Sequence, residues 1–210
     1  MSGDQNMITK VLRIDSSAQK KGSVSRRIGD EVIRRLAVRH AGMEVMNLDL
    51  NDGIGHIDGD WVDASFTPEG QRSAAQRKQL APSDRAVATL KEADAVVLTA
   101  PVYNFSIPSV LKAWVDQICR PGLTFRYTEN GPQGLLADRP VYLVMASGGV
   151  PFGSPVDFAS GYLKQVFRFV GIEDVRLIGA ERVEADAQLA KESALSVLDG
   201  WLPETVGQVA

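Results

Sequence analysis

The segment PVYNF (residues 101–105) follows a continuous apolar run at 95–100 and precedes a helical pattern that begins at Pro108. A short apolar run of this kind is typical of a buried strand, and proline is favoured at a helix start. The segment is therefore interpreted as a loop that joins a strand to a helix. Open α/β sheets bind ligands at such loops. The segment 101–105 offers the aromatic rings of Tyr103 and Phe105, the amide of Asn104 and several backbone groups. These groups would suit a flat heteroaromatic cofactor.

Apolar, β-rich runs alternate with helical patterns along the rest of the chain. Residues 8–14, 44–49, 95–100, 140–146 and 174–179 are expected to be strands. Amphipathic periodicity predicts helices at about 24–37, 83–92, 108–119, 157–169 and 186–201. This alternation predicts an α/β fold with a doubly wound, five-stranded parallel sheet of order 2-1-3-4-5 and helices on both faces.

The chain is expected to form a single domain over residues 1–210, with 1–7 as a loose N-terminal extension. The segments 51–73 and 121–137 are rich in glycine, and they are predicted to be loop-like insertions. Neither is long enough to be a domain of its own.

Composition excludes several classes of protein. The net charge is -3 and 44% of residues are hydrophobic, which gives no reason to expect nucleic acid or an anionic membrane as a partner. The basic residues of 26–35 are interleaved with acids and indicate a solvated helix face. Cys119 is the single cysteine, so no internal disulfide forms and a cytoplasmic location is expected. His40 and His56 are too few for a metal site, and neither a signal peptide nor a membrane span is expected.

A hydroxyl-rich loop follows the first predicted strand. The chain has neither the G-x-G-x-x-G fingerprint nor the P-loop motif. Ser17 instead lies near the end of the strand, and Ser23, Val24 and Ser25 begin the first helix. The free N–H groups and the dipole of a helix N-terminus favour a phosphate monoester there. Serines at this position are also ordinary N-caps, and the sequence leaves both interpretations open.

A third loop, with the sequence ASGGV (residues 146–150), follows the fourth predicted strand. Its two glycines either let the backbone approach a planar ligand or form a turn. The first, third and fourth strands are neighbours at the switch point of the sheet, so the loops after them open on one crevice. A phosphate loop, an aromatic loop and a glycine loop together describe a site for FMN, with the isoalloxazine between the last two.

Three motifs carry a family resemblance: PVYNFSIPSxLK at 101–112, GLTFRYTENGPxGL at 122–135 and ASGGV at 146–150. They resemble the FMN-dependent NADH-azoreductases, also described as NADH:quinone reductases, of the flavodoxin-like superfamily. The similarity runs from about Ile8 to Val197. The family commonly has methionine where this chain has Val102. The resemblance implies FMN contacts at Ser17, Ser23, Val24, Ser25, Val102, Tyr103, Asn104, Phe105, Ala146, Ser147, Gly148 and Gly149.

The resemblance also implies a homodimer in which the partner subunit completes each flavin pocket. Phe125 and Tyr127 are expected to line the substrate pocket, because a loop rich in glycine and asparagine has little interior of its own. The apolar helix at 108–119 offers further surface for a partner. Its Trp114 is expected to pack in the core.

The activity implied by the resemblance is a two-electron, ping-pong transfer from NADH through FMN to quinones and aromatic azo compounds. No side chain is expected to be an obligatory acid or base, although Tyr127 is a candidate to orient the acceptor. A flavodoxin-like electron carrier without NADH turnover is one alternative. A phosphodiester hydrolase is another, but the sequence shows no nucleophile or metal set for it.

Overall fold

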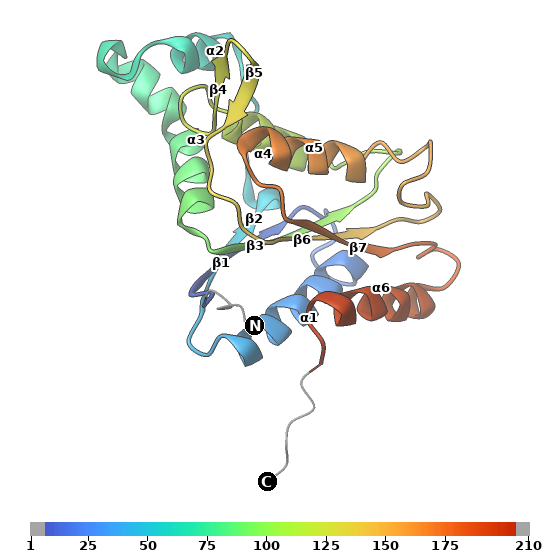
Figure 1. The fold of residues 1–210 in the computed structure, drawn as a ribbon. Helices are drawn as coiled ribbons and strands as arrows, with labels where there is room; N and C mark the ends of the chain where they lie inside the picture. The colour runs from blue at the N-terminus through green and yellow to red at the C-terminus, as the bar shows by residue number, and fades with distance from the viewer. Residues whose placement is uncertain (1–6, 205–210) are drawn as a thin grey trace.

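The computed structural model describes residues 7–204, and a five-stranded parallel sheet of order β2-β1-β3-β6-β7 lies at its centre (Figure 1). Counted within this sheet, the order is 2-1-3-4-5, which confirms the predicted doubly wound α/β fold. Of the expected N-terminal extension, residues 1–6 lie outside the described residues. The strands are β1 (Lys10–Asp15), β2 (Glu44–Asp49), β3 (Ala95–Pro101), β6 (Val141–Ala146) and β7 (Val175–Ala180).

Helices cover both faces of the sheet. α1 (Val24–Arg39) and α6 (Ala187–Trp201) lie on one face. α3 (Ala74–Glu92), α4 (Ser109–Ile118) and α5 (Ser160–Val170) lie on the other (Figure 1). A separate cluster of buried apolar side chains forms on each face. The central strands β3 and β6 are buried on both sides, which explains their continuous apolar sequences.

The first insertion is more ordered than predicted. It contains α2 (Gly59–Phe66) and two short 3-10 turns, η1 (Leu50–Asp52) and η2 (Glu69–Gln71). The helix is short and surrounded by glycine and proline, so its periodicity is hard to detect in the sequence. α3 also begins at Ala74, nine residues before the predicted start at 83, and continues through Pro82. A capping box formed by Ser73 and Gln76 stabilises this early start.

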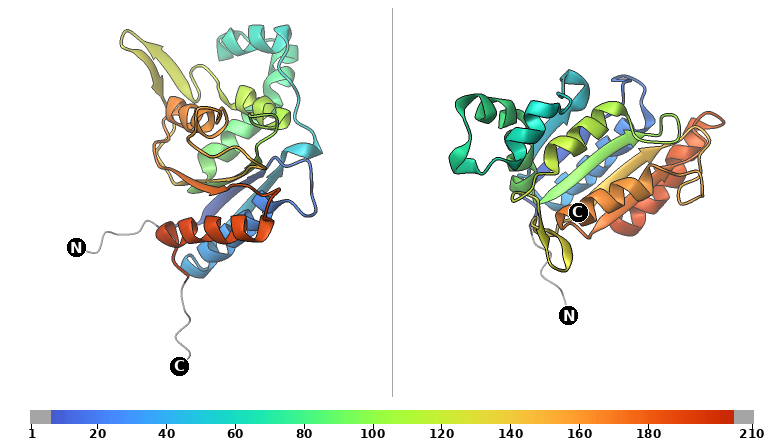
Figure 2. Two further views of the ribbon diagram at one scale, coloured as in Figure 1. Left: turned by 90° about the vertical axis from the view of Figure 1, so that its right-hand side faces the viewer. Right: turned by 90° about the horizontal axis from the view of Figure 1, so that it is seen from above.

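The second insertion contains an antiparallel hairpin of β4 (Phe125–Thr128) and β5 (Gly131–Gly134), and Figure 2 shows it projecting from the body of the protein. The hairpin rests on the end of α5. A Cβ at Gly134 would lie 2.2 Å from the backbone nitrogen of Gly171, so only glycine permits this contact.

Phe125 is buried beneath the hairpin, with its ring centroid 4.4 Å from that of Phe169. The expectation that this loop lacks an interior was therefore wrong, and packing accounts for Phe125. Tyr127, in contrast, is 72% exposed.

Two further expectations need correction. The apolar side of α4 packs within the chain, so this helix offers little apolar surface to a partner; Trp114 is buried, as predicted. The interpretation of 26–35 as a solvated helix face was wrong for Arg26 and Arg35, whose side chains are only 12% and 5% exposed. Both form ion pairs, and Arg35 joins α1 to Asp199 of α6.

Among residues 7–204, no helix has both the length and the apolar character needed to cross a membrane.

α1 approaches β3 closely at one point. A Cβ at Gly29 would lie 2.5 Å from Cγ2 of Thr99. Replacing Gly29 by alanine should therefore move the helix away from the sheet and lower the free energy of unfolding by about 1–3 kcal/mol. Urea unfolding followed by circular dichroism measures the change. Gly161→Ala is the control, because its added Cβ meets no atom within 4 Å; equal stabilities of the two variants would contradict the close contact.

Candidate functional site

The loops that follow β1, β3 and β6 are joined to neighbouring strands at the carboxyl edge of the sheet. Ser16 N–H donates to the carbonyl of Thr99 at 3.1 Å, and Val102 N–H donates to the carbonyl of Ala146 at 2.8 Å. Ser147 N–H donates to the carbonyl of Ala180 at 2.9 Å. Because the three strands are adjacent, these bonds bring the three predicted loops to one edge.

The first loop (residues 16–23) has unused hydrogen-bond donors. No backbone N–H of residues 17–23 donates to an atom of another described residue. The loop ends at Ser23, the N-cap of α1, whose Oγ lies 3.1 Å from Oγ of Ser25 and accepts from Arg26 N–H at 3.4 Å. Ser17 is buried as well, but its hydroxyl bonds to neither serine. Two of the three predicted hydroxyls therefore lie together, and Ser23 also acts as a cap.

The second loop contains a two-residue turn. Tyr103 and Ser106 exchange backbone hydrogen bonds of 2.9 and 3.0 Å, with Asn104 and Phe105 between them at φ values of 49° and 69°. Consecutive positive φ values are those of a type I′ turn. Asparagine accepts this conformation readily, but an aromatic residue there is strained. Strain of this kind is concentrated at functional sites. The turn leaves the side chains of Tyr103 and Phe105 39% and 56% exposed.

The third loop is a turn closed by Ser147, whose Oγ accepts from Val150 N–H at 2.7 Å. A Cβ at Gly148 would lie 2.8 Å from the side chain of Glu184, whereas Gly149 has open space around it. The N–H groups of both glycines have no acceptor within residues 7–204. The loop is therefore a turn that also presents two free donors.

These features fit a cofactor with a phosphate and a flat ring. The unused N–H groups and paired hydroxyls of the first loop would hold an anion at the start of α1. The other two loops supply exposed aromatic faces and N–H donors beside it. In the part of the chain that the structure describes, no group of three or more His, Cys, Asp or Glu side chains could hold a metal ion.

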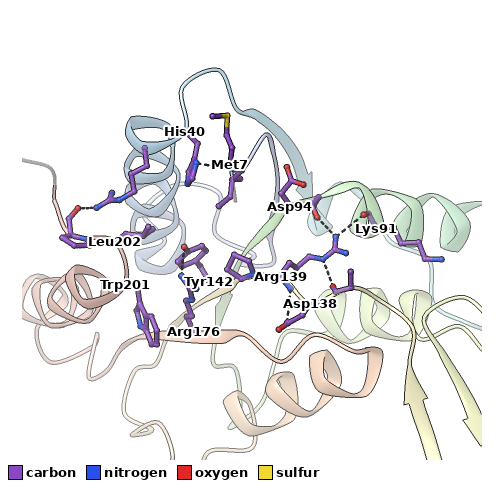
Figure 3. Close-up of a pocket in the computed structure, with 16 residues that line it drawn as sticks. Met7, His40, Lys91, Asp94, Asp138, Arg139, Tyr142, Arg176, Trp201 and Leu202 are labelled. Atoms are coloured by element: carbon purple, nitrogen blue, oxygen red, sulfur yellow. Dashed lines mark hydrogen bonds between the residues drawn. The ribbon is translucent and has the colours of Figure 1, made fainter. Parts of the chain in front are cut away.

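A cavity of about 600 Å³ lies at the opposite edge, beside the amino ends of the strands (Figure 3). Its polar groups bond mainly to one another and to backbone. Asp94 accepts from the N–H groups of Thr9 and Lys10, and Arg139 donates to carbonyls at the end of α3. The carboxyl edge is the candidate site, because open α/β sheets bind ligands there.

Sequence reasoning missed three residues that contact the first loop. Arg26 and Asn51 both donate to the carbonyl of Ser17, and Asp49 binds both of them. The available signal was the polar sequence at the end of β2, directly beside β1, which places these side chains next to the first loop.

A parallel sheet of this order, with an aromatic turn and a donor-rich first loop at its switch point, defines a flavodoxin-like protein. Comparison with known proteins agrees, since residues 9–201 match the family described as having the flavodoxin-like fold. FMN-dependent NADH:quinone oxidoreductase 1 of Hahella chejuensis is 44% identical over 181 residues, covering 86% of this chain and 89% of the relative. The chain thus belongs to the family of FMN-dependent NADH:quinone oxidoreductases and azoreductases.

Solved structures show the same likeness. The azoreductase of Bacillus anthracis str. Sterne superposes with a TM-score of 0.81 at 27% identity, covering 91% of this chain and 96% of that one. An FMN-dependent NADH-azoreductase from Bacillus anthracis str. Ames Ancestor, solved in complex with FMN, gives a TM-score of 0.79 at 26% identity and covers 91% of this chain and 97% of that one.

Proposed function

We propose that this protein is an FMN-dependent NADH oxidoreductase that reduces quinones and aromatic azo compounds by a ping-pong mechanism. One observation carries the proposal: the unused N–H donors of the first loop lie beside the aromatic turn at the edge where a flavodoxin-like sheet binds its cofactor. The names of its relatives, FMN-dependent NADH:quinone oxidoreductase and FMN-dependent NADH-azoreductase, support the same activity.

The first loop holds the phosphate of FMN. The hydroxyls of Ser23 and Ser25 and the N–H groups of residues 17–23 supply its hydrogen bonds, with Val24 in the first turn of α1. Ser17 provides a further hydroxyl at the entrance to the loop. The positive end of the helix dipole adds a favourable interaction with the dianion.

The second and third loops hold the flavin ring. Tyr103, Asn104 and Phe105 line one side, and residues 146–149 line the other. The N–H groups of Gly148 and Gly149 stabilise negative charge that develops on the reduced ring. Val102 packs its side chain against the core and uses its N–H within the sheet. Its remaining contact with the ring is through the backbone, so the methionine common in the family is not required there.

When bound, FMN supplies the two-electron chemistry, taking hydride from NADH and reducing the acceptor in a second half-reaction. The protein contributes binding and orientation. Nicotinamide, quinones and azo compounds are all flat, so exposed aromatic side chains at the same slot can bind each in turn. Tyr127 lies at the other edge of its own sheet, on the hairpin beside the end of α5 (Figure 2), so as the candidate to orient the acceptor it would act at the site of a second subunit. Solvent can supply the protons.

The test of this function is anaerobic reduction of the purified protein. We expect a yellow protein, or one that FMN reconstitutes, which NADH bleaches and a quinone or azo dye then reoxidises. Yellow protein that neither NADH nor NADPH bleaches would instead indicate the flavodoxin-like electron carrier. Protein that FMN cannot reconstitute would contradict both flavin functions.

The phosphate contacts can be tested by replacing Ser23 and Ser25 together with alanine. FMN binding should weaken by roughly 1–4 kcal/mol, because two hydroxyl bonds to a charged group are lost. Quenching of flavin fluorescence measures the dissociation constant. Ser73→Ala removes the N-cap of α3 and controls for loss of a cap alone. If the folded double variant binds FMN like the parent protein, the two serines serve only the helix.

We also infer that the active protein is a homodimer, because two loops of one chain make only half a slot for the acceptor. The exposed apolar surface near this edge comes from Tyr103 and Phe105. Tyr127 lies at the other edge, on the hairpin that packs on the C-terminal end of α5 (Figure 2), and α2 exposes Val62 and Phe66. A two-fold interface that joins such surfaces should exceed about 1,000 Å² in total. Sedimentation of the FMN-bound protein should give a mass near twice 22.7 kDa. A monomer with full quinone reductase activity would rule out a shared site.

A further inference from the structure

Arg26 lies in the first turn of α1 and is largely buried beneath the first loop. Its Nη1 and Nη2 donate to the two carboxylate oxygens of Asp49 at 2.9 and 3.0 Å. Nη2 also donates to the carbonyl oxygen of Ser17 at 2.8 Å. The guanidinium therefore joins the end of β2 to the backbone of the loop that follows β1.

Asn51 makes a second bond to the same carbonyl. Its Nδ2 donates to the oxygen of Ser17 at 2.9 Å and to Oδ1 of Asp49 at 3.0 Å. The backbone N–H of Asn51 also donates to that carboxylate oxygen, at 3.1 Å. We call Arg26, Asp49 and Asn51 the clamp. Its members come from α1, β2 and η1, and they fix one backbone carbonyl.

The charges around the clamp are balanced. Arg26 lies 3.5 Å from the carboxylate of Asp15 as well as close to Asp49, and Arg13 pairs with Asp15 at 3.0 Å. Burial opposes ionisation of Asp49, but hydrogen bonds from Arg26 and Asn51 outweigh it and hold the pKa of this carboxyl below its ordinary value. The carboxyl of Asp49 is therefore ionised at neutral pH. The clamp holds one cation and one anion, Arg13 and Asp15 beside it add one of each, and Lys20, 3.7 Å from Asp49, is paired with Asp52. Little net charge is left to attract a distant anion, so the clamp contributes by fixing the position of the loop backbone.

Fixing the carbonyl of Ser17 also fixes the direction of the next N–H group, because the peptide group is planar. In a trans peptide, the carbonyl of one residue and the N–H of the next point in opposite directions. The bonds to the carbonyl of Ser17 thus turn the N–H of Ala18 away from Arg26 and Asn51. This N–H belongs to the run of donors at 17–23 that has no acceptor among the described residues.

We propose that Arg26 is a positioning residue, which acts through the carbonyl of Ser17 to hold the N–H groups of the first loop ready for the phosphate of FMN. This inference rests on the proposed function. Fixing the loop before binding lowers the entropy that the phosphate contacts must overcome. A merely structural role, in which Arg26 ties β2 to α1, would affect every flavin equally.

The comparison of FMN with riboflavin separates these roles, because riboflavin has the same ring without the phosphate. In Arg26→Gln, the dissociation constant of FMN should rise by about tenfold or more, as expected for loss of hydrogen bonds from a charged donor, while that of riboflavin should change by less than about threefold. Flavin fluorescence and thermal unfolding are measured on the same samples. Arg27→Gln removes the same charge from the adjacent exposed position and should leave both constants unchanged.

Two further variants keep the proposal testable if Arg26→Gln folds poorly. Asn51→Ala removes one of the two donors to Ser17 and leaves the ion pair, so it should weaken FMN binding selectively but less. Asp49→Asn should weaken FMN binding, and its effect should not add to that of Arg26→Gln, because both break one network.

These experiments distinguish failure of the positioning role of Arg26 from failure of the proposed FMN-dependent function. Equal losses for FMN and riboflavin, or no loss for FMN, would overturn the positioning role while the parent protein still binds FMN. A parent protein that binds neither flavin would overturn both. Rescue supports the role: Arg26→Lys keeps a cation that can reach one acceptor, so its FMN affinity should fall between those of the parent protein and Arg26→Gln.

Discussion

The carboxyl edge depends on the contacts of one buried residue, Thr99 in β3. Its Oγ1 donates to Asp15 at 2.6 Å, and its carbonyl accepts from both the N–H and the hydroxyl of Ser16. Its methyl group faces Gly29 of α1, where no larger side chain fits. Thr99 therefore sets the exit direction of the first loop and the distance of α1 from the sheet together. Because the start of α1 and that loop form the candidate phosphate site, its geometry is fixed by packing in the core.

The sequence predicted the sheet well because each buried strand is a continuous apolar run between two amphipathic patterns. These signals are local, and the strand order follows from general rules of α/β folds. The structure of the two insertions could not be predicted in this way. α2 is stabilised by contacts of Trp61, whose indole N–H donates to Gln117 of α4 at 3.1 Å. The hairpin is stabilised by Phe125 on Phe169. Both contacts are remote in sequence, so the local glycine content wrongly indicated loops.

In the candidate site, too, some features follow from local sequence and others depend on contacts between segments remote in sequence. The location of its three loops followed from the strand order, and the exposed rings of Tyr103 and Phe105 follow from the motif itself. The conformation of the turn at Asn104 and Phe105 could not be predicted, because a positive φ contradicts the intrinsic preference of phenylalanine. Arg26 was also misjudged, since a charged residue on an amphipathic helix normally faces solvent. Its carboxylate partners, Asp49 at the end of β2 and Asp15 at the end of β1, are brought together by the parallel pairing of these two strands.

The two ends of the proposed flavin site differ in rigidity, and this difference suits the chemistry. At the phosphate end, bonds from buried residues hold the backbone, and directional N–H donors select one charged group. At the ring end, Tyr103 and Phe105 are exposed and offer flat surfaces. Stacking on such surfaces depends on area and shape more than on particular polar atoms. A site built in this way keeps one cofactor in a fixed position while it accepts donors and acceptors that share only a planar ring.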